Sequence, residues 1–252
     1  IDVILTNRGS VSVRAVAGMR VGGQTVAPGQ AVSLAGGTAN ITSGCGGPIV
    51  RSVRATFVEP LHAGPSRPAG EILTFCGSGA KYRGALGFAG GRVVNRVHID
   101  DYVKGVLPKE ISPGWADGGG AEAIKAQAVA ARTYALAALA DGKRIDDTQN
   151  SQVYGGASVE DRRTNAAADA TAGQVRLAAG KPAFTEFSAS TSYAGRDAIS
   201  YREAPGSGSP IRWYVLVSDS LQVSIGCQGG DQGQSLDAEC AQAVSSVRIS
   251  PR

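Results

Sequence analysis

The sequence predicts an α+β fold in which mixed sheets pack around a central alanine-rich helix, behind a β-rich N-terminal segment. Short alternating runs separated by Gly and Pro fill the first 80 residues, which is typical of short strands. Residues 121–140 have the apolar spacing of one long helix, and strand-like runs return after residue 173. We therefore divide the chain into a β-rich segment, 1–80, and a second domain, 81–252.

Strands of the N-terminal segment are indicated by alternation of apolar and polar residues between Val3 and Phe75. Residues 62–70 (HAGPSRPAG) predict a surface loop because Gly and Pro dominate them. Two more strands are expected between Tyr82 and Ile99. The clearest strand-like runs are Val11–Val16, Ala31–Leu34, Val50–Phe57 and Arg92–Ile99.

A short helix is expected next, capped by Asp100 or Asp101 and running through Val106. We expect Pro108 to end it, because a proline has no N–H to donate. Gly118–Gly120 is then expected to act as a hinge-like linker.

The long helix at residues 121–140 carries Ile124, Ala128, Ala131 and Ala135 on one face. Its many alanines allow neighbouring elements to approach closely, so we expect the helix to be central and largely buried. The remaining predicted elements are a helix at Ser158–Ala172 and strands at Gly173–Leu177, Ala183–Ala189 and Trp213–Ser218.

Composition indicates a globular protein, with 42% hydrophobic and 18% charged residues in a chain of 252. No apolar run approaches the roughly 18 residues that cross a bilayer. The chain begins at Ile1 without an initiator Met, so we expect a signal or anchor to have been removed. The expected location is extracellular or in the cell envelope.

The net charge of +4 is uneven along the chain. Residues 1–80 hold six arginines, no lysine and three acids, a balance of +3 that leaves +1 for the rest. A basic first segment favours an anionic polymer such as a cell-wall or lipid surface. Nucleic acid is disfavoured as a partner, because no basic run is interleaved with aromatics and aromatics make up 6% of the chain.

Four cysteines allow three disulfide connectivities, and none of them forms a CxxC pair. Spacings of 31 and 13 residues favour two local disulfides, Cys45–Cys76 and Cys227–Cys240, which would place the protein outside the cytoplasm. The alternative is four buried free thiols. With two histidines in the chain, no zinc-finger spacing exists, and no metal or other cofactor is predicted.

One acid, Glu110, stands between Pro108 and Pro113, directly before the alanine-rich helix. A carboxylate on a stiff loop beside a close-packing helix is how a groove enzyme would present a single general acid. The same pattern is compatible with an ordinary helix–turn–helix corner and a solvated acid. Other chemistries lack their motifs: there is no G-x-S-x-G elbow, no P-loop lysine after Gly118–Gly120, and no calcium loop around Asp146.

Four blocks resemble the stage II sporulation protein D and amidase enhancer (LytB) family, and together they cover roughly residues 81–200. The most specific is the helix segment AIKAQAVAARTYA. The blocks are Val94–Val106 with Pro108-Lys-Glu110, Ala123–Ala135, Asp147–Gly156 and Phe187–Arg196.

This resemblance implies that residues 81–252 form a stage II sporulation protein D-like catalytic domain acting on peptidoglycan. Members are lytic transglycosylases that cut glycan strands and leave 1,6-anhydro ends, or enhancers of a partner amidase. The family's catalytic acid carries over to Glu110. Such an acid must be protonated at neutral pH, so we expect its pKa to be raised by an apolar setting, with Lys109 facing solvent.

Other candidate substrate-binding residues have ordinary structural alternatives. Gln127 and Arg132 could bond sugar hydroxyls or hold the Glu110 loop, or they could tie down backbone carbonyls. A polar rim suited to glycan is predicted, which strand-end polarity explains almost as well; its members are Tyr154, Ser190, Thr191 and Tyr193. Trp115 and Trp213 could stack on sugar rings or belong to the core.

Two departures from the family pattern bear on activity. Many members of the family carry Cys and His in the block corresponding to residues 145–151, and some bind zinc there; this chain has Ile145, Asn150 and Ser151, which leaves no soft ligand for zinc. The family's loop with paired glycines is represented here by residues 190–193, STSY. The rival hypothesis is therefore a non-catalytic wall-binding module that enhances a partner amidase.

Overall fold

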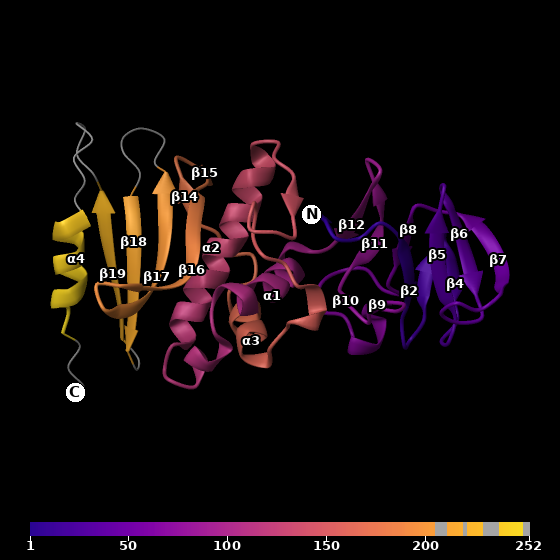
Figure 1. Cartoon of the computed structure of the whole chain (residues 1–252), viewed down its shortest axis with the longest axis horizontal. Coiled ribbons are helices and arrows are strands. Elements are labelled where there is room, and N and C mark those ends of the chain that lie inside the picture. Colours follow the sequence, from indigo (N-terminus) through magenta and orange to yellow (C-terminus); the bar gives the residue numbers. More distant parts are fainter. Residues whose placement is uncertain (205–210, 219–220, 229–236, 249–252) are drawn as a thin grey trace. The chain divides into compact units, whose positions relative to one another are not determined.

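The computed structural model describes residues 1–204, 211–218, 221–228 and 237–248 and confirms the α+β class (Figure 1). The chain folds as two compact units. Unit 1 comprises residues 1–106 and 144–160, and unit 2 comprises residues 107–143 and 161–252. The domain boundary predicted near residue 80 stays a prediction. No helix in the described ranges is long and apolar enough to cross a membrane.

Unit 1 contains two sheets built from short strands, as the alternating N-terminal runs predict. In a seven-stranded sheet, all neighbouring strands pair antiparallel except the first two in spatial order, which pair in parallel. In spatial order its strands are β13 (Ile145–Asp146), β1 (Asp2–Ile4), β12 (Arg92–Arg96), β11 (Ala85–Ala89), β8 (Phe57–Glu59), β3 (Met19–Val21) and β4 (Gln24–Val26). A six-stranded antiparallel sheet has the order β10 (Lys81–Tyr82), β9 (Leu73–Phe75), β2 (Val11–Arg14), β5 (Ala31–Ala35), β6 (Thr38–Thr42) and β7 (Ile49–Arg54).

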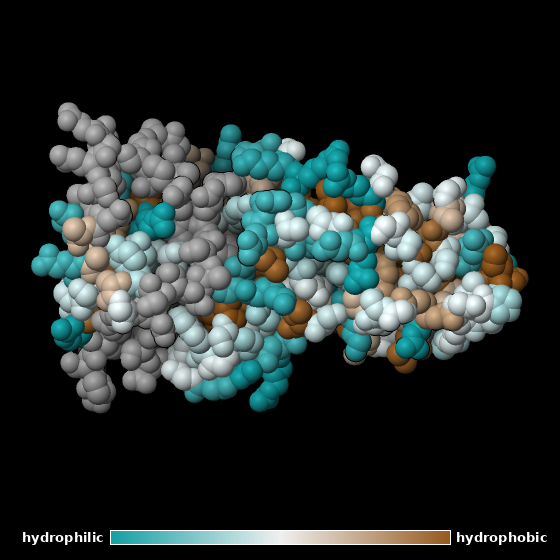
Figure 2. Space-filling model, in the orientation of Figure 1, coloured by the Kyte–Doolittle hydropathy of each residue, from teal (hydrophilic) through white to brown (hydrophobic). Residues whose placement is uncertain are grey.

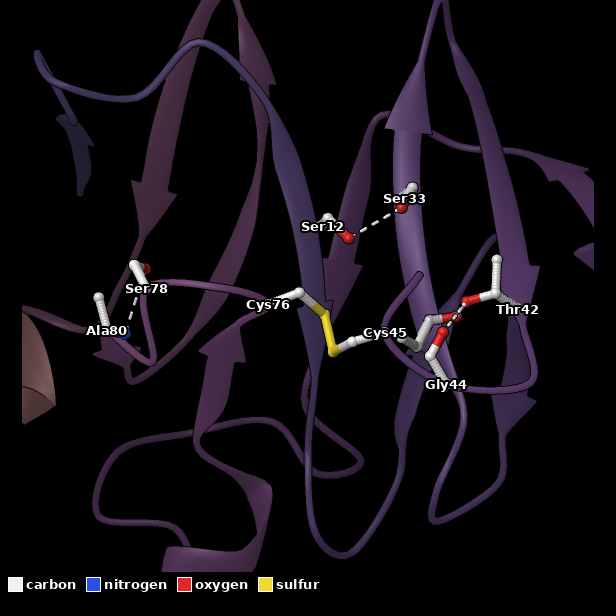
Figure 3. The surroundings of a disulfide bond; sticks show 9 residues. Ser12, Ser33, Thr42, Gly44, Cys45, Cys76, Ser78 and Ala80 are labelled. Carbon is white, nitrogen blue, oxygen red and sulfur yellow. Dashed lines mark hydrogen bonds between the residues drawn. A yellow bond between two sulfur atoms is a disulfide. The ribbon is translucent and has the colours of Figure 1, made fainter. Parts of the chain in front are cut away.

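The six-stranded sheet is fastened by the disulfide between Cys45 and Cys76, as Figure 3 shows. It joins the loop between β6 and β7 to the residue after β9, with the two Cα atoms 5.6 Å apart. The backbone N–H of Cys76 donates to the carbonyl of Ser12 at 2.8 Å, and Ser12 Oγ accepts from Ser33 Oγ at 2.9 Å. The disulfide therefore fixes a loop over three neighbouring strands, β2, β5 and β9.

β7 is the edge strand of the six-stranded sheet, and its apolar side chains are exposed. Ile49 is 60% exposed and Val50 is 56% exposed. Figure 2 shows a brown patch where Figure 1 labels β7.

Helix α1 (Ile99–Glu110) contains residues of both units and corrects one prediction. The helix does not end before Pro108 but continues through it to Glu110, and the N–H of Ile111 still donates to the Leu107 carbonyl at 2.9 Å. A proline removes one hydrogen bond and crowds the carbonyl four residues earlier. Pro108 lies in the last turn of α1, so the cost falls on that turn alone. The hydrogen bond from Ile111 to Leu107 keeps this part of the chain helical.

In unit 1, α1 is packed against a buried tyrosine. A Cβ added to Gly105 would lie 2.4 Å from Cε2 of Tyr154, so a glycine is required for this contact. The hydroxyl of Tyr154 donates to Oδ1 of the buried Asn95 at 2.7 Å. The Asn95 amide donates in turn to the carbonyls of Arg83 and Ala85, at 2.8 and 2.9 Å. These bonds tie residues 144–160 to β12 and the chain leading into β11.

Unit 2 is organised around helix α2 (Ala121–Ala140), whose bounds match the prediction. Helix α3 (Arg162–Ala170) packs against it and is shorter than predicted, because Asp161 caps it by accepting the N–H of Arg163 at 2.8 Å. Short 3-10 turns form at Ala69–Glu71, Pro113–Ala116 and Gly156–Ser158. The strands of unit 2 are β14 (Leu177–Ala178), β15 (Lys181–Pro182), β16 (Phe184–Tyr193), β17 (Arg196–Ala204), β18 (Ile211–Ser218) and β19 (Leu221–Gln228).

β16 to β19 form a four-stranded antiparallel sheet that packs on α2 by one face and on helix α4 (Asp237–Ser246) by the other. Thr185 in β16 donates its hydroxyl to the Ala130 carbonyl of α2 at 2.9 Å. Tyr214 and Leu216 pack on Val244 of α4. The predicted disulfide Cys227–Cys240 joins β19 to α4, so both predicted pairings are confirmed.

Candidate functional site

Glu110 is the last residue of α1 and is half-buried, between the exposed Lys109 and the buried Ile111. Lys109 is exposed, as predicted. The sequence predicted that Glu110 lies on a stiff loop between Pro108 and Pro113. This prediction is wrong, because Glu110 belongs to α1. The partial negative charge of a helix C-terminus disfavours a charged carboxylate in its last turn.

The chain after Glu110 turns tightly around Trp115 before α2 begins. The N–H groups of Gly118 and Gly120 both donate to the Trp115 carbonyl, at 3.2 and 2.7 Å. A Cβ at Gly120 would lie 2.8 Å from that carbonyl oxygen and 3.1 Å from the Trp115 Cβ. The Gly118–Gly120 segment is thus a closed turn and not the hinge-like linker that was predicted. It leaves the Trp115 side chain half-buried.

Gln127 lies on the buried part of α2 and is 2% exposed. Its Nε2 has no hydrogen-bond partner among the described residues. Buried amide groups are nearly always bonded, and leaving one unbonded costs free energy. Gln127 therefore carries a buried donor that no described residue satisfies.

Arg132 is fully buried on α2 and binds backbone carbonyls, one of the two roles that its sequence left open. Nη1 donates to the carbonyls of Gln174 at 3.1 Å and Ala128 at 3.4 Å, and Nη2 donates to that of Ala168 at 3.3 Å. Ala168 lies in the last turn of α3, where carbonyls lack helical partners and a cation is favoured. Arg132 thus joins α2 to the end of α3 and to the segment that follows it.

Thr133 continues this attachment one residue later. Its hydroxyl donates to the Val129 carbonyl at 2.6 Å and accepts the backbone N–H of Arg176 at 3.0 Å. Segment 171–176, where a strand was predicted from residue 173, is held as a turn and an irregular stretch that reaches β14 at Leu177. The Gln174 carbonyl and the Arg176 N–H bond to side chains of α2, while the Arg176 carbonyl accepts the N–H of Ala183 at 3.0 Å.

The residues of the predicted polar rim belong to two different units. Tyr154 belongs to unit 1, is 4% exposed, and has its pKa raised well above the ordinary value by burial. Tyr193, at the end of β16, stacks on Tyr214 with ring centroids 4.0 Å apart and packs on the core beneath α4. Sugar contacts by these two residues stay predictions.

Ser190 and Thr191 lie in β16, where the pairing with β17 shifts register between Ser188 and Thr191. Their side chains lie outside the described part of the structure. Trp213 is half-buried in β18, packed over Gly226 of β19, where an added Cβ would lie 2.9 Å from the indole ring. Within the described residues, no group of three or more His, Cys, Asp or Glu side chains is arranged to hold a metal ion.

Sequence reasoning missed a charged cluster at the start of α3. The Asp161 carboxylate binds Arg163 through Nε at 2.9 Å and Nη2 at 2.8 Å, and Arg163 Nη1 also binds the exposed Asp117. The Arg163 bonds lower the pKa of Asp161 to about 2, and the two carboxylates raise the pKa of Arg163. This cluster ties α3 to the turn after Trp115. Two acids followed by two arginines at residues 160–163 were its signal in the sequence.

These features define an α+β protein in which a half-buried acid ends α1 and the alanine-rich α2 follows it along the chain. A sequence profile of the Stage II sporulation protein family matches residues 89–177, a segment that contains Glu110, Gln127 and Arg132. This match supports the assignment of the segment to that family.

Two relatives support the assignment. An uncharacterized protein of Brachyspira hyodysenteriae is 40% identical over 121 residues, 44% of this chain and 32% of that protein. The amidase enhancer of Bacillus subtilis is 44% identical over 73 residues, 29% of this chain and 9% of that protein. The matches thus span less than a third of either relative. No solved structure matches the chain significantly.

We expect Arg132→Met to destabilise the protein strongly, because three carbonyls, two of them in buried hydrogen bonds, lose a charged donor. The free energy of unfolding should fall by about 3 kcal/mol or more, measured by urea denaturation. Arg162→Met, at an exposed position of α3, is the matched control and should change it by less than about 0.5 kcal/mol. A loss at Arg132 no larger than at Arg162 would contradict the anchoring role.

The Asp161–Arg163 bonds should make stability depend on pH in the acid range. A carboxyl whose pKa is lowered from 3.8 to about 2 contributes stability above pH ~4, and that stability is lost between pH ~4 and ~2. Asp161→Asn keeps a capping oxygen but removes the charge. Its urea midpoint should lie below that of the wild type at pH 7 and converge with it near pH 2. Asp141→Asn, at an exposed helix end, should show no such convergence; equal midpoints for Asp161→Asn and wild type at pH 7 would refute the account.

Proposed function

We propose that this protein is a peptidoglycan lytic transglycosylase in which Glu110 is the single general acid and base. The observation that carries the proposal is the placement of Glu110. It lies inside the segment that matches the family, at the C-terminal end of α1, next to the buried Ile111.

The reaction needs one carboxyl group and no water. Glu110 as a carboxylic acid protonates the glycosidic oxygen, and the bond from that oxygen to C1 of the sugar breaks. The carboxylate then takes the proton of the same sugar's C6 hydroxyl, whose oxygen bonds C1 and closes a 1,6-anhydro ring. The acid is regenerated, and the glycan is cut into two strands. Two-carboxylate glycosidases, by contrast, place a second acid across the bond.

Rigid placement of Glu110 is what the surrounding residues contribute. The Trp115 turn fixes the path from α1 to α2, and the Asp117–Arg163 ion pair fixes the same turn to α3. The buried Nε2 of Gln127 is the donor we assign to the substrate or to the Glu110 carboxyl. A general acid held in this way contributes about 10²–10⁴-fold to a rate.

We place the protein outside the cytoplasm, secreted or in the cell envelope. Both pairs of cysteines form disulfides, which persist in oxidising compartments. Peptidoglycan glycan strands are accordingly the proposed partner.

The second candidate function is that of a wall-binding module that enhances a cell-wall amidase. The similarity to the Bacillus subtilis amidase enhancer favours it. In that role Glu110 would need neither protonation nor contact with a glycosidic oxygen, and the amidase would be a second partner.

Glu110→Gln separates the two functions, because an amide of the same shape cannot donate and recover a proton in this way. Purified peptidoglycan, with and without its stem peptides, is incubated with the protein, and new ends are identified by mass spectrometry. We expect anhydro-ended products from the wild type and a rate about 10²–10⁴-fold lower from Glu110→Gln.

Glu122→Gln is the matched control, since Glu122 is an exposed acid of the same unit, paired with Lys125 at 2.6 Å. It should cut at the wild-type rate. If wild type and Glu110→Gln both bind the wall without making new ends, and both speed up an added amidase equally, the transglycosylase proposal fails and the enhancer function replaces it.

A further inference from the structure

Unit 1 contains a cavity of about 360 Å³ that takes no part in the proposed reaction. It lies between the end of β3, the end of β8 with the loop that follows it, and the chain after β12. Most of its charged lining residues are cationic or can become so. The residues that are cationic or can become so are Arg20, Arg67, Arg96, His62 and His98. The one acid in the lining is Glu59.

One wall of the cavity, the loop at residues 61–67, is held in place by α1. Both carboxylate oxygens of Asp101 accept the N–H of Ser66, at 3.1 and 3.2 Å, and Lys104 Nζ donates to Ser66 Oγ at 2.7 Å. The carbonyl of Arg67 accepts a bond from Arg83 at 3.3 Å. Because Asp101 and Lys104 are buried, these bonds give the loop one fixed conformation. A site whose groups are already ordered binds at a lower entropic cost.

Several charges near the cavity are already compensated. Arg96 binds both carboxylate oxygens of Asp2, at 2.8 and 2.9 Å. Nδ1 of His62 lies 2.6 Å from Oε1 of the buried Glu71. Burial alone would raise the pKa of Glu71, but the hydrogen bonds from His62 and the charge of Arg67 lower it. Nδ1 of His98 accepts the Asp100 N–H at 3.3 Å and lies 3.5 Å from Asp100 Oδ2.

Two arginines remain as donors. Nε of Arg67 is buried and has no hydrogen-bond partner among the described residues. Arg20 is exposed and, within the described ranges, its side chain makes no hydrogen bond or ion pair, although Glu59 is its cross-strand neighbour. Both arginines line the cavity, and a guanidinium carries five N–H donors, so donors other than the buried Nε of Arg67 can bind an anion held there.

We propose that this cavity binds an oxyanion, a carboxylate or phosphate group, through the guanidinium groups of Arg20 and Arg67. A guanidinium presents a planar fork of donors that matches both groups. The bound group could belong to an anionic wall polymer or to a free small anion, since either supplies the same oxygens. The site lies in unit 1 and stands independently of Glu110.

The test is an NMR titration of the full chain with inorganic phosphate and, separately, with acetate, at constant ionic strength. The backbone amides of Gly64 and Gly84, which both line the cavity, are the reporters. We expect saturable shifts at these amides. The Kd should rise roughly tenfold or more in Arg67→Gln and in Arg20→Gln, because each removes a charged donor. Arg54→Gln, an exposed arginine of β7 outside the cavity, should leave the Kd unchanged.

Each outcome decides the proposal. Binding of phosphate alone supports a phosphate-bearing ligand, binding of acetate alone supports a carboxylate, and binding of both supports the shared oxyanion site. Arg20 is exposed, so its replacement decides the matter if Arg67→Gln does not fold. Absence of saturable shifts with both anions, or equal weakening by Arg54→Gln, would overturn it.

Discussion

The buried guanidinium of Arg132 is the interaction on which unit 2 depends. An alanine-rich helix has little side-chain surface with which to grip its neighbours, and α2 meets α3 and β16 mainly through small residues. Arg132 compensates by reaching three carbonyls, one in α2, one in the last turn of α3 and one in the segment beyond it. A charge with no exposed surface persists only when its donors are bonded. The same bonds therefore stabilise the charge and orient α3.

From this anchor the structure reaches the candidate acid through short polar contacts. The N-terminus of α3 carries Asp161 and Arg163, and Arg163 holds Asp117 in the turn around Trp115. Four residues, 111–114, connect Trp115 to Glu110. Close packing of alanines and a few fixed ion pairs thus replace a large apolar interface. A groove enzyme needs this rigidity, since a general acid acts only within hydrogen-bond reach of its oxygen.

Much of the fold could be predicted from the sequence, because its signals are local. The alternation in the first segment predicted short strands, the 121–140 spacing predicted α2 with its bounds, and cysteine spacing predicted both disulfides. The predicted end of α1 was wrong, because one proline in the last turn costs too little free energy to stop a helix. The sequence left two roles open for Arg132 and could not decide between them, because two of its acceptors lie 36 and 42 residues further along the chain. The oxyanion cavity joins β3, β8 and the chain after β12, which no local pattern brings together.

The most direct test of the central claim is a crystal structure of Glu110→Gln with a bound peptide-free glycan oligosaccharide. The account predicts a glycosidic oxygen about 2.6–3.2 Å from the side chain at position 110, with the C6 hydroxyl of the adjoining sugar on the same side. A glycan bound in unit 2 with every glycosidic oxygen beyond reach of that side chain would contradict it. The protein would then be a wall-binding module, and its contribution to cutting would have to come from a partner.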